Sequence, residues 1–216
     1  MQVDTTVKNK KHHNNMKKIN LRTIRLAASA LILTGVIGSP IVASAAANTA
    51  STTINASVGA SISVTTTATV SLSLTPTAGG VVSSASDTVT VNTNNATGYM
   101  LTLADGDANV NLSSGGNLIG AHSGTQASPT ALGANTWGYA VANVGGFDSS
   151  YSAETNNTSS ASKWAGMPVV GAPNQLKSTS NIATNDTTIV WYGVRANSAQ
   201  PNGTYSDTVT YTATTN

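Results

Sequence analysis

The sequence contains no cysteine. A disulfide framework, a thiolate metal site and a cysteine nucleophile are therefore excluded. Charge is also scarce, since only 8% of the residues are charged, against about 25% in an average soluble domain. Seven of the ten lysines and arginines precede residue 26, so the rest of the chain carries three cations and seven carboxylates. An acidic, lysine-poor region of this kind does not attract nucleic acid, and we expect no nucleic-acid partner.

Residues 1–45 have the parts of a bacterial signal peptide. Residues 16–25 are basic, residues 26–42 are apolar, and Ala43-Ser44-Ala45 is an A-x-A cleavage site. We predict Sec export with cleavage after Ala45, and translation from Met16, because residues 1–15 are polar and unusual in a leader. The expected location is extracellular or at the cell surface. The alternative is an uncleaved leader, in which residues 26–46 anchor the protein in the membrane.

Apolar residues recur at every second position in much of the remaining chain, as in strands that bury one face. Val70, Leu72 and Leu74 show this spacing, and so do Val190, Tyr192 and Val194. No segment after the leader has the i, i+3, i+4 spacing of a long helix. We predict a flexible segment over residues 46–60 and an all-β domain over residues 61–216. The expected fold is a single antiparallel β-sandwich, Ig-like or jelly-roll-like, after an N-terminal signal helix.

Four short motifs carry a resemblance to known secreted proteins. They are WYGV at residues 191–194, PNGTYSDTVTYTA at 201–213, ATGYMLTL at 96–103 and NTWGY at 135–139. Together they resemble predicted β-sandwich surface proteins of candidate-phylum (Saccharibacteria-like) bacteria. They are also similar to spore-coat-U-type and pilin-like domains and to WxL cell-wall-binding domains, although the chain lacks a W-x-L motif. The resemblance implies a non-catalytic surface or appendage protein.

The residues available for catalysis are few. After the leader the chain has one histidine, His122, and one glutamate, Glu154. His122 lies between glycines at 120 and 124, which predicts an exposed loop histidine; a hydrolase would need it or Glu154 in a pocket with other acids. Zinc would need further nitrogen or sulfur ligands. We therefore predict no enzyme activity and no cofactor.

One run of residues has the spacing of calcium ligands. Asp105, Asp107 and Asn109 place side-chain oxygens at alternate positions, as calcium-binding loops do. The run lacks the glycine and the final glutamate of an EF-hand, since Val110 and Gly116 stand at those positions. We therefore predict no metal site and a hairpin turn at Asp105-Gly106, with a strand returning over residues 108–112. Calcium binding by Asp105, Asp107 and Asn109 is the alternative.

The aromatic residues suggest a second kind of function. Trp137 and Trp191 lie in strong strand patterns, whereas Trp164 lies in a long loop. We predict that Trp164 pins this loop to a sheet; among the three tryptophans it is the candidate for an exposed aromatic. We predict a structural or adhesive protein that presents the loops at 113–135 and 145–185 to an unknown surface partner or associates with itself by strand addition. The alternative is a carbohydrate- or cell-wall-binding module with Trp164 in contact with the glycan.

Overall fold

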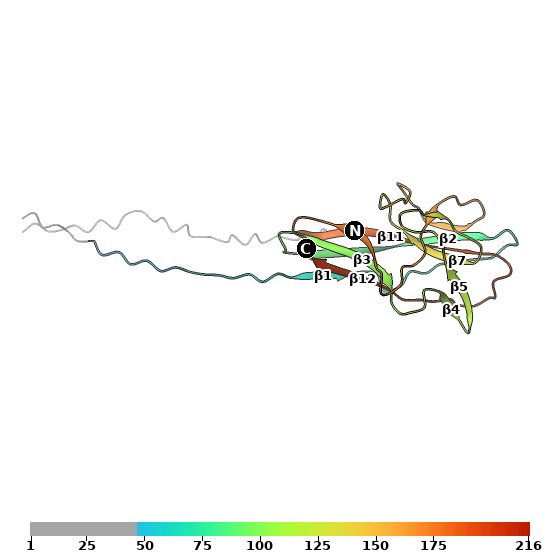
Figure 1. Ribbon diagram of the computed structural model, residues 1–216, viewed down its shortest axis with the longest axis horizontal. Coiled ribbons are helices and arrows are strands. Elements are labelled where there is room, and N and C mark those ends of the chain that lie inside the picture. The colour runs from blue at the N-terminus through green and yellow to red at the C-terminus, as the bar shows by residue number, and fades with distance from the viewer. Residues whose placement is uncertain (1–46) are drawn as a thin grey trace, which may run out of the picture. The chain divides into compact units, whose positions relative to one another are not determined.

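A computed structural model describes residues 47–216, which are all-β and contain no helix (Figure 1). The all-β class is thus confirmed. The predicted signal helix, the start at Met16 and the cleavage site at Ala43 and Ala45 lie outside the described residues. Residues 47–61 are exposed and form no strand. No helix in the described part is long and apolar enough to cross a membrane.

The strands are β1 (Ile62–Thr65), β2 (Val81–Thr93), β3 (Tyr99–Asp105), β4 (Leu112–Ser114), β5 (Asn117–Ala121), β6 (Thr130–Ala131), β7 (Thr136–Ala140), β8 (Glu154–Asn157), β9 (Lys163–Trp164), β10 (Asn174–Ser178), β11 (Ala183–Ala196) and β12 (Val209–Thr215).

The two longest strands, β2 and β11, form one continuous antiparallel ladder. Residues 186–196 of β11 pair without interruption with residues 91–81 of β2. The predicted alternation along β11 is confirmed, because Val190, Tyr192 and Val194 are buried while Ile189 is 51% exposed. The residues Val190, Tyr192 and Val194 of β11 thus present one apolar face to the core.

Further strands extend this ladder into a seven-stranded sheet. Its order is β1-β2-β11-β7-β5-β4, and β8 also pairs with β2. β1 and β8 pair with opposite ends of β2, over residues 90–93 and 82–84. The prediction of a wholly antiparallel fold is wrong at one place, since β5 runs parallel to β7. The chain between them passes through β6, which pairs with β9, and re-enters the sheet in the same direction.

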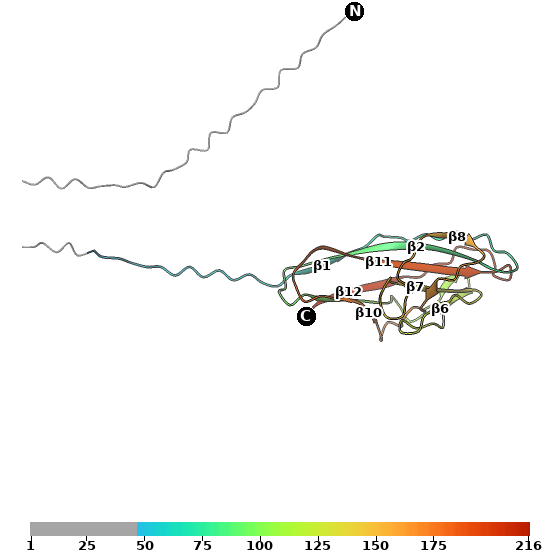
Figure 2. The ribbon, with the colours of Figure 1, turned by 90° about the horizontal axis from the view of Figure 1, so that it is seen from above.

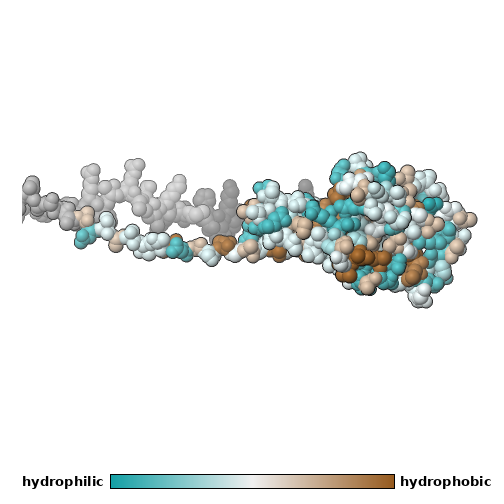
Figure 3. Space-filling model, viewed as in Figure 1, coloured by the Kyte–Doolittle hydropathy of each residue, from teal (hydrophilic) through white to brown (hydrophobic). Residues whose placement is uncertain are grey.

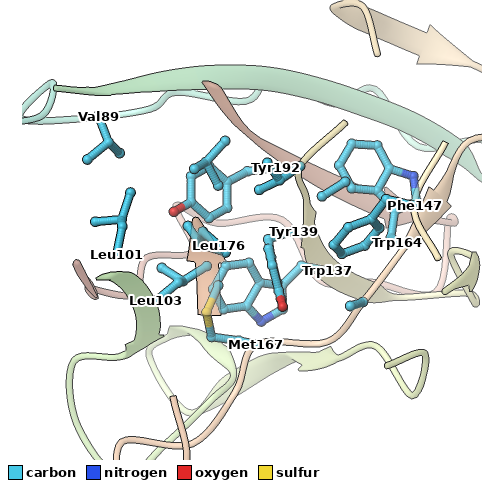
Figure 4. Close-up of a cluster of buried hydrophobic side chains, with 14 of the residues drawn as sticks. Val89, Leu101, Leu103, Trp137, Tyr139, Phe147, Trp164, Met167, Leu176 and Tyr192 are labelled. Carbon is cyan, nitrogen blue, oxygen red and sulfur yellow. The ribbon is translucent and has the colours of Figure 1, made fainter. Parts of the chain in front are cut away.

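A second, three-stranded sheet faces one half of the ladder. Its order is β10-β3-β12, and all its pairs are antiparallel. Figure 2 shows it as a layer apart from β1, β2 and β11. Val89 from the first sheet and Leu101, Leu103 and Leu176 from the second are buried between the two layers (Figure 4). The interior of this half is therefore formed mainly by aliphatic side chains, together with the buried ring of Tyr99.

The other half of the ladder has an aromatic core. Tyr139, Phe147 and Trp164 gather there (Figure 4), and the rings of Tyr139 and Phe147 meet edge to face at 5.5 Å. A Cβ added to Gly193 of β11 would lie 2.8 Å from the Trp164 ring, so only glycine leaves room for that ring. The outer surface is mostly polar in the view of Figure 3, with apolar side chains confined to small patches.

One acidic side chain interrupts the buried stripe of β2. Asp87 is 4% exposed and stands two residues before Val89. Its carboxylate accepts hydrogen bonds from the Thr67 amide (3.0 Å) and from the hydroxyls of Thr66 and Thr67. Burial acts to raise the pKa of Asp87, but these donors and Tyr211 outweigh it and lower the pKa. Asp87 therefore fastens the strandless segment after β1 to the sheet.

Replacing Asp87 by asparagine should test this attachment. We expect Asp87→Asn to lower the free energy of unfolding at pH 7 by about 1–3 kcal/mol, because buried donors lose a charged acceptor. A lowered folded-state pKa contributes stability that is present above the unfolded value near 3.8 and is lost as the pH falls through the folded value. The deficit of the variant should therefore shrink toward pH 3 in urea titrations.

The matched control is Asp148→Asn. Asp148 accepts the Lys163 amide at 2.9 Å, for which asparagine keeps an acceptor oxygen. Its carboxylate also lies 3.8 Å from the Lys163 ammonium in a partly exposed ion pair, and such pairs contribute at most about 1 kcal/mol. A deficit in Asp87→Asn that is no larger than that of the control, or that stays constant from pH 7 to pH 3, would contradict the role assigned to Asp87.

Candidate functional site

Three aspartates meet where β3 ends and β12 begins. Asp105 is the last residue of β3, Asp107 follows it, and Asp207 precedes β12. Asp105 pairs with Val209, and the Gly106 amide donates to the Thr208 carbonyl (2.8 Å). Because the two strands are antiparallel, the chain leaving β3 passes the chain entering β12. One carboxylate oxygen from each aspartate lies within 4.8 Å of the others. We call these three residues the aspartate cluster.

The carboxylates of the aspartate cluster have few hydrogen-bond donors. Asp105 is fully buried; its Oδ1 accepts the Asp107 amide (2.8 Å), but its Oδ2 has no donor within residues 47–216. Asp207 is half-buried; one oxygen accepts the Thr208 amide (2.7 Å), and the buried Oδ2 has no donor in the same region. Burial, with repulsion from Asp105 and Asp107, raises the pKa of Asp207 to about 6. The cluster is thus a concentration of poorly compensated negative charge.

The three residues of the calcium alternative are only partly brought together. Asp105 and Asp107 join the cluster, whereas the side-chain oxygen of Asn109 accepts both the amide (3.4 Å) and the side-chain nitrogen (2.7 Å) of Asn111. The predicted hairpin at Asp105-Gly106 is wrong. β3 pairs with β10 and β12, and Gly106 does not have the positive φ of a type I′ turn. Asp207 was missed because it lies about a hundred residues away along the chain.

His122 is buried, which corrects the prediction of an exposed loop histidine. Only 8% of it is exposed. Its Nε2 lies 2.8 Å from the Thr130 hydroxyl, and its Nδ1 accepts the Gly133 amide at 3.4 Å. Burial lowers the pKa of the imidazole, so the neutral ring is favoured. A neutral histidine that uses both nitrogens in this way fastens residues 130–133 to the end of β5.

His122 also lines an open hollow of about 580 Å³. The lining includes Thr125, Gln126, Met167 and Asn174, but no aspartate or glutamate of the described part of the chain. Glu154 accepts hydrogen bonds from Ser160 and Ser162 instead. The pocket of His122 or Glu154 with further acids that a hydrolase requires is therefore not formed at this hollow.

Trp164 is buried, so it is not the exposed aromatic that the glycan-binding alternative requires. It is 1% exposed, packs against Gly193, and meets Tyr151 edge to face at 5.4 Å. The Ala165 amide and carbonyl both pair with Tyr139 of β7. Trp164 thus fastens the long loop to the sheet. Trp137 is also buried, and its indole nitrogen donates to the Val110 carbonyl (3.0 Å).

The comparisons with known proteins place the chain in no family. No protein-family model, no curated protein and no solved structure matches it.

Proposed function

We propose that the protein is exported and acts outside the cytoplasm as a structural or adhesive β-sandwich protein without a catalytic role. The signal-peptide pattern of residues 1–45 supports export. The two sheets lie face to face, which supports a β-sandwich of the Ig-like or jelly-roll-like kind. The parallel pair of β5 and β7 differs from a wholly antiparallel sandwich. His122 was the candidate for catalysis and Trp164 the candidate for ligand contact, but both are buried and hold loops in place.

One observation carries the structural role: β1 is an uncharged edge strand. It pairs with β2 on one side only, and the chain has no charged residue from position 46 to position 86. Residues 55–61, which precede β1, are exposed, and Val58 among them is 87% exposed. Proteins that avoid strand addition place charges or prolines on such edges. The edge of β1 is therefore suited to pairing with a strand of a second copy.

A carbohydrate-binding module is the alternative, and the aromatic residues favour it less. Stacking on a sugar needs exposed aromatic rings. Trp137 and Trp164 are buried, and Trp191 is half-buried. Strand addition at β1 therefore has more support than glycan stacking.

Strand addition can be tested with two matched threonines. Thr65 of the edge strand and Thr187 of the central strand β11 are both exposed and both pair with Thr90 of β2. The parent should form larger species as its concentration rises in sedimentation velocity. We expect Thr65→Lys to keep the protein monomeric, because a lysine blocks an edge, and Thr187→Lys to leave association unchanged. A monomeric parent, or equal effects of both variants, would refute strand addition.

Export has a direct test in the mass and location of the mature protein. Cells are separated into medium, wall, membrane and cytoplasmic fractions, and the protein in each is measured by intact mass spectrometry. We expect a chain that begins near Ala46, in the medium or the wall fraction. A membrane-bound chain that retains residues 26–46 would establish the anchored alternative, and an uncleaved chain in the cytoplasm would overturn export.

A further inference from the structure

The aspartate cluster joins two segments that only the fold brings together. Asp105 and Asp107 follow β3, and Asp207 precedes β12, at the end of the second sheet. A Cβ added to Gly106 would lie 2.8 Å from the Thr208 carbonyl oxygen, so the two backbones approach as closely as glycine allows. The backbone thus holds the carboxylates near one another.

The second observation is a buried oxygen without a partner. Asp105 has no exposed surface, and its Oδ2 accepts no hydrogen bond from residues 47–216. One carboxylate oxygen of Asp105 lies within 4.8 Å of an oxygen of Asp107 and of Asp207. Asp207 Oδ2 is also buried and has no donor among residues 47–216. Leaving a buried carboxylate uncompensated is costly. The unused oxygens therefore call for a positively charged partner.

No side-chain cation of the described region supplies that charge. Lys163 pairs with Asp148 at 3.8 Å and Lys177 with Asp186 at 2.5 Å. The Arg195 guanidinium donates to the carbonyls of Leu132 (3.0 Å) and Gly79 (3.1 Å). All three cations of residues 47–216 are thus engaged elsewhere.

We propose that Asp105, Asp107 and Asp207 bind one divalent cation, of the calcium type. Calcium takes carboxylate oxygens at 2.3–2.6 Å, so two oxygens on one ion lie at most about 5 Å apart, as those of the cluster do. Three protein oxygens leave positions for water, and the dissociation constant should be of the order of 10⁻⁴–10⁻³ M, as in extracellular modules. The ion would fasten the end of β3 to the start of β12.

The test is a calcium titration of the purified protein after removal of metal with EDTA. At pH 7.5 and constant ionic strength, added CaCl₂ should raise the melting temperature by several degrees and saturate near millimolar concentration. Isothermal titration calorimetry should give one site per chain. MgCl₂ serves as the comparison and should have the smaller effect, because magnesium demands a stricter octahedron.

Variants assign the site to its residues. Asp207→Asn should abolish the calcium-dependent rise, and Asp107→Asn, which changes an exposed carboxylate, should weaken binding at least about tenfold. Asp148→Asn, outside the cluster, should keep the full response. The proposal is overturned if CaCl₂ up to 10 mM neither binds nor stabilises the parent, or if Asp207→Asn and Asp107→Asn respond as the parent does. Because these readouts do not depend on export or self-association, they are independent of the proposed function.

Discussion

The ladder between β2 and β11 is the constraint on which the rest of the structure depends. It runs through eleven consecutive residue pairs, and both parts of the core lie against it. At one end it bears Val89 and Val190, which face the aliphatic layer from β3 and β10; at the other it bears Gly193, which receives the Trp164 ring. A slip of one residue of β11 in this register would turn Val190, Tyr192 and Val194 away from the core. The two halves of the domain therefore share one register.

Much of the β-structure could be read from the sequence, because alternation records which face of a strand is buried. The stripe Val190, Tyr192 and Val194 is found as predicted. Pairing could not be read in the same way. Nothing local in residues 99–105 or 209–215 indicates that these strands are neighbours, and the parallel alignment of β5 and β7 depends on β6 and β9. Register is set by distant contacts, which a single sequence does not display.

The candidate site likewise depends on a contact between residues far apart in the sequence. Asp105 and Asp107 could be found by their spacing, but Asp207 joins them only through the ladder of β3 and β12. The misplacement of His122 has a different cause. The glycines at 120 and 124 predict an exposed loop, whereas a Cβ added to Gly124 would lie 2.4 Å from the Trp164 carbonyl oxygen. Glycine occurs both in flexible loops and where two backbones pack closely, so its presence alone does not distinguish the two.

The most direct measurement of the shared ladder is native-state hydrogen exchange followed amide by amide in increasing denaturant. If β2 and β11 hold both halves together, their paired amides should be the slowest to exchange, with one opening free energy along residues 81–91 and 186–196 equal to that of global unfolding. The result that would contradict this is a separate, lower opening free energy for residues 191–195 beside β7, with the β3–β10–β12 half still protected.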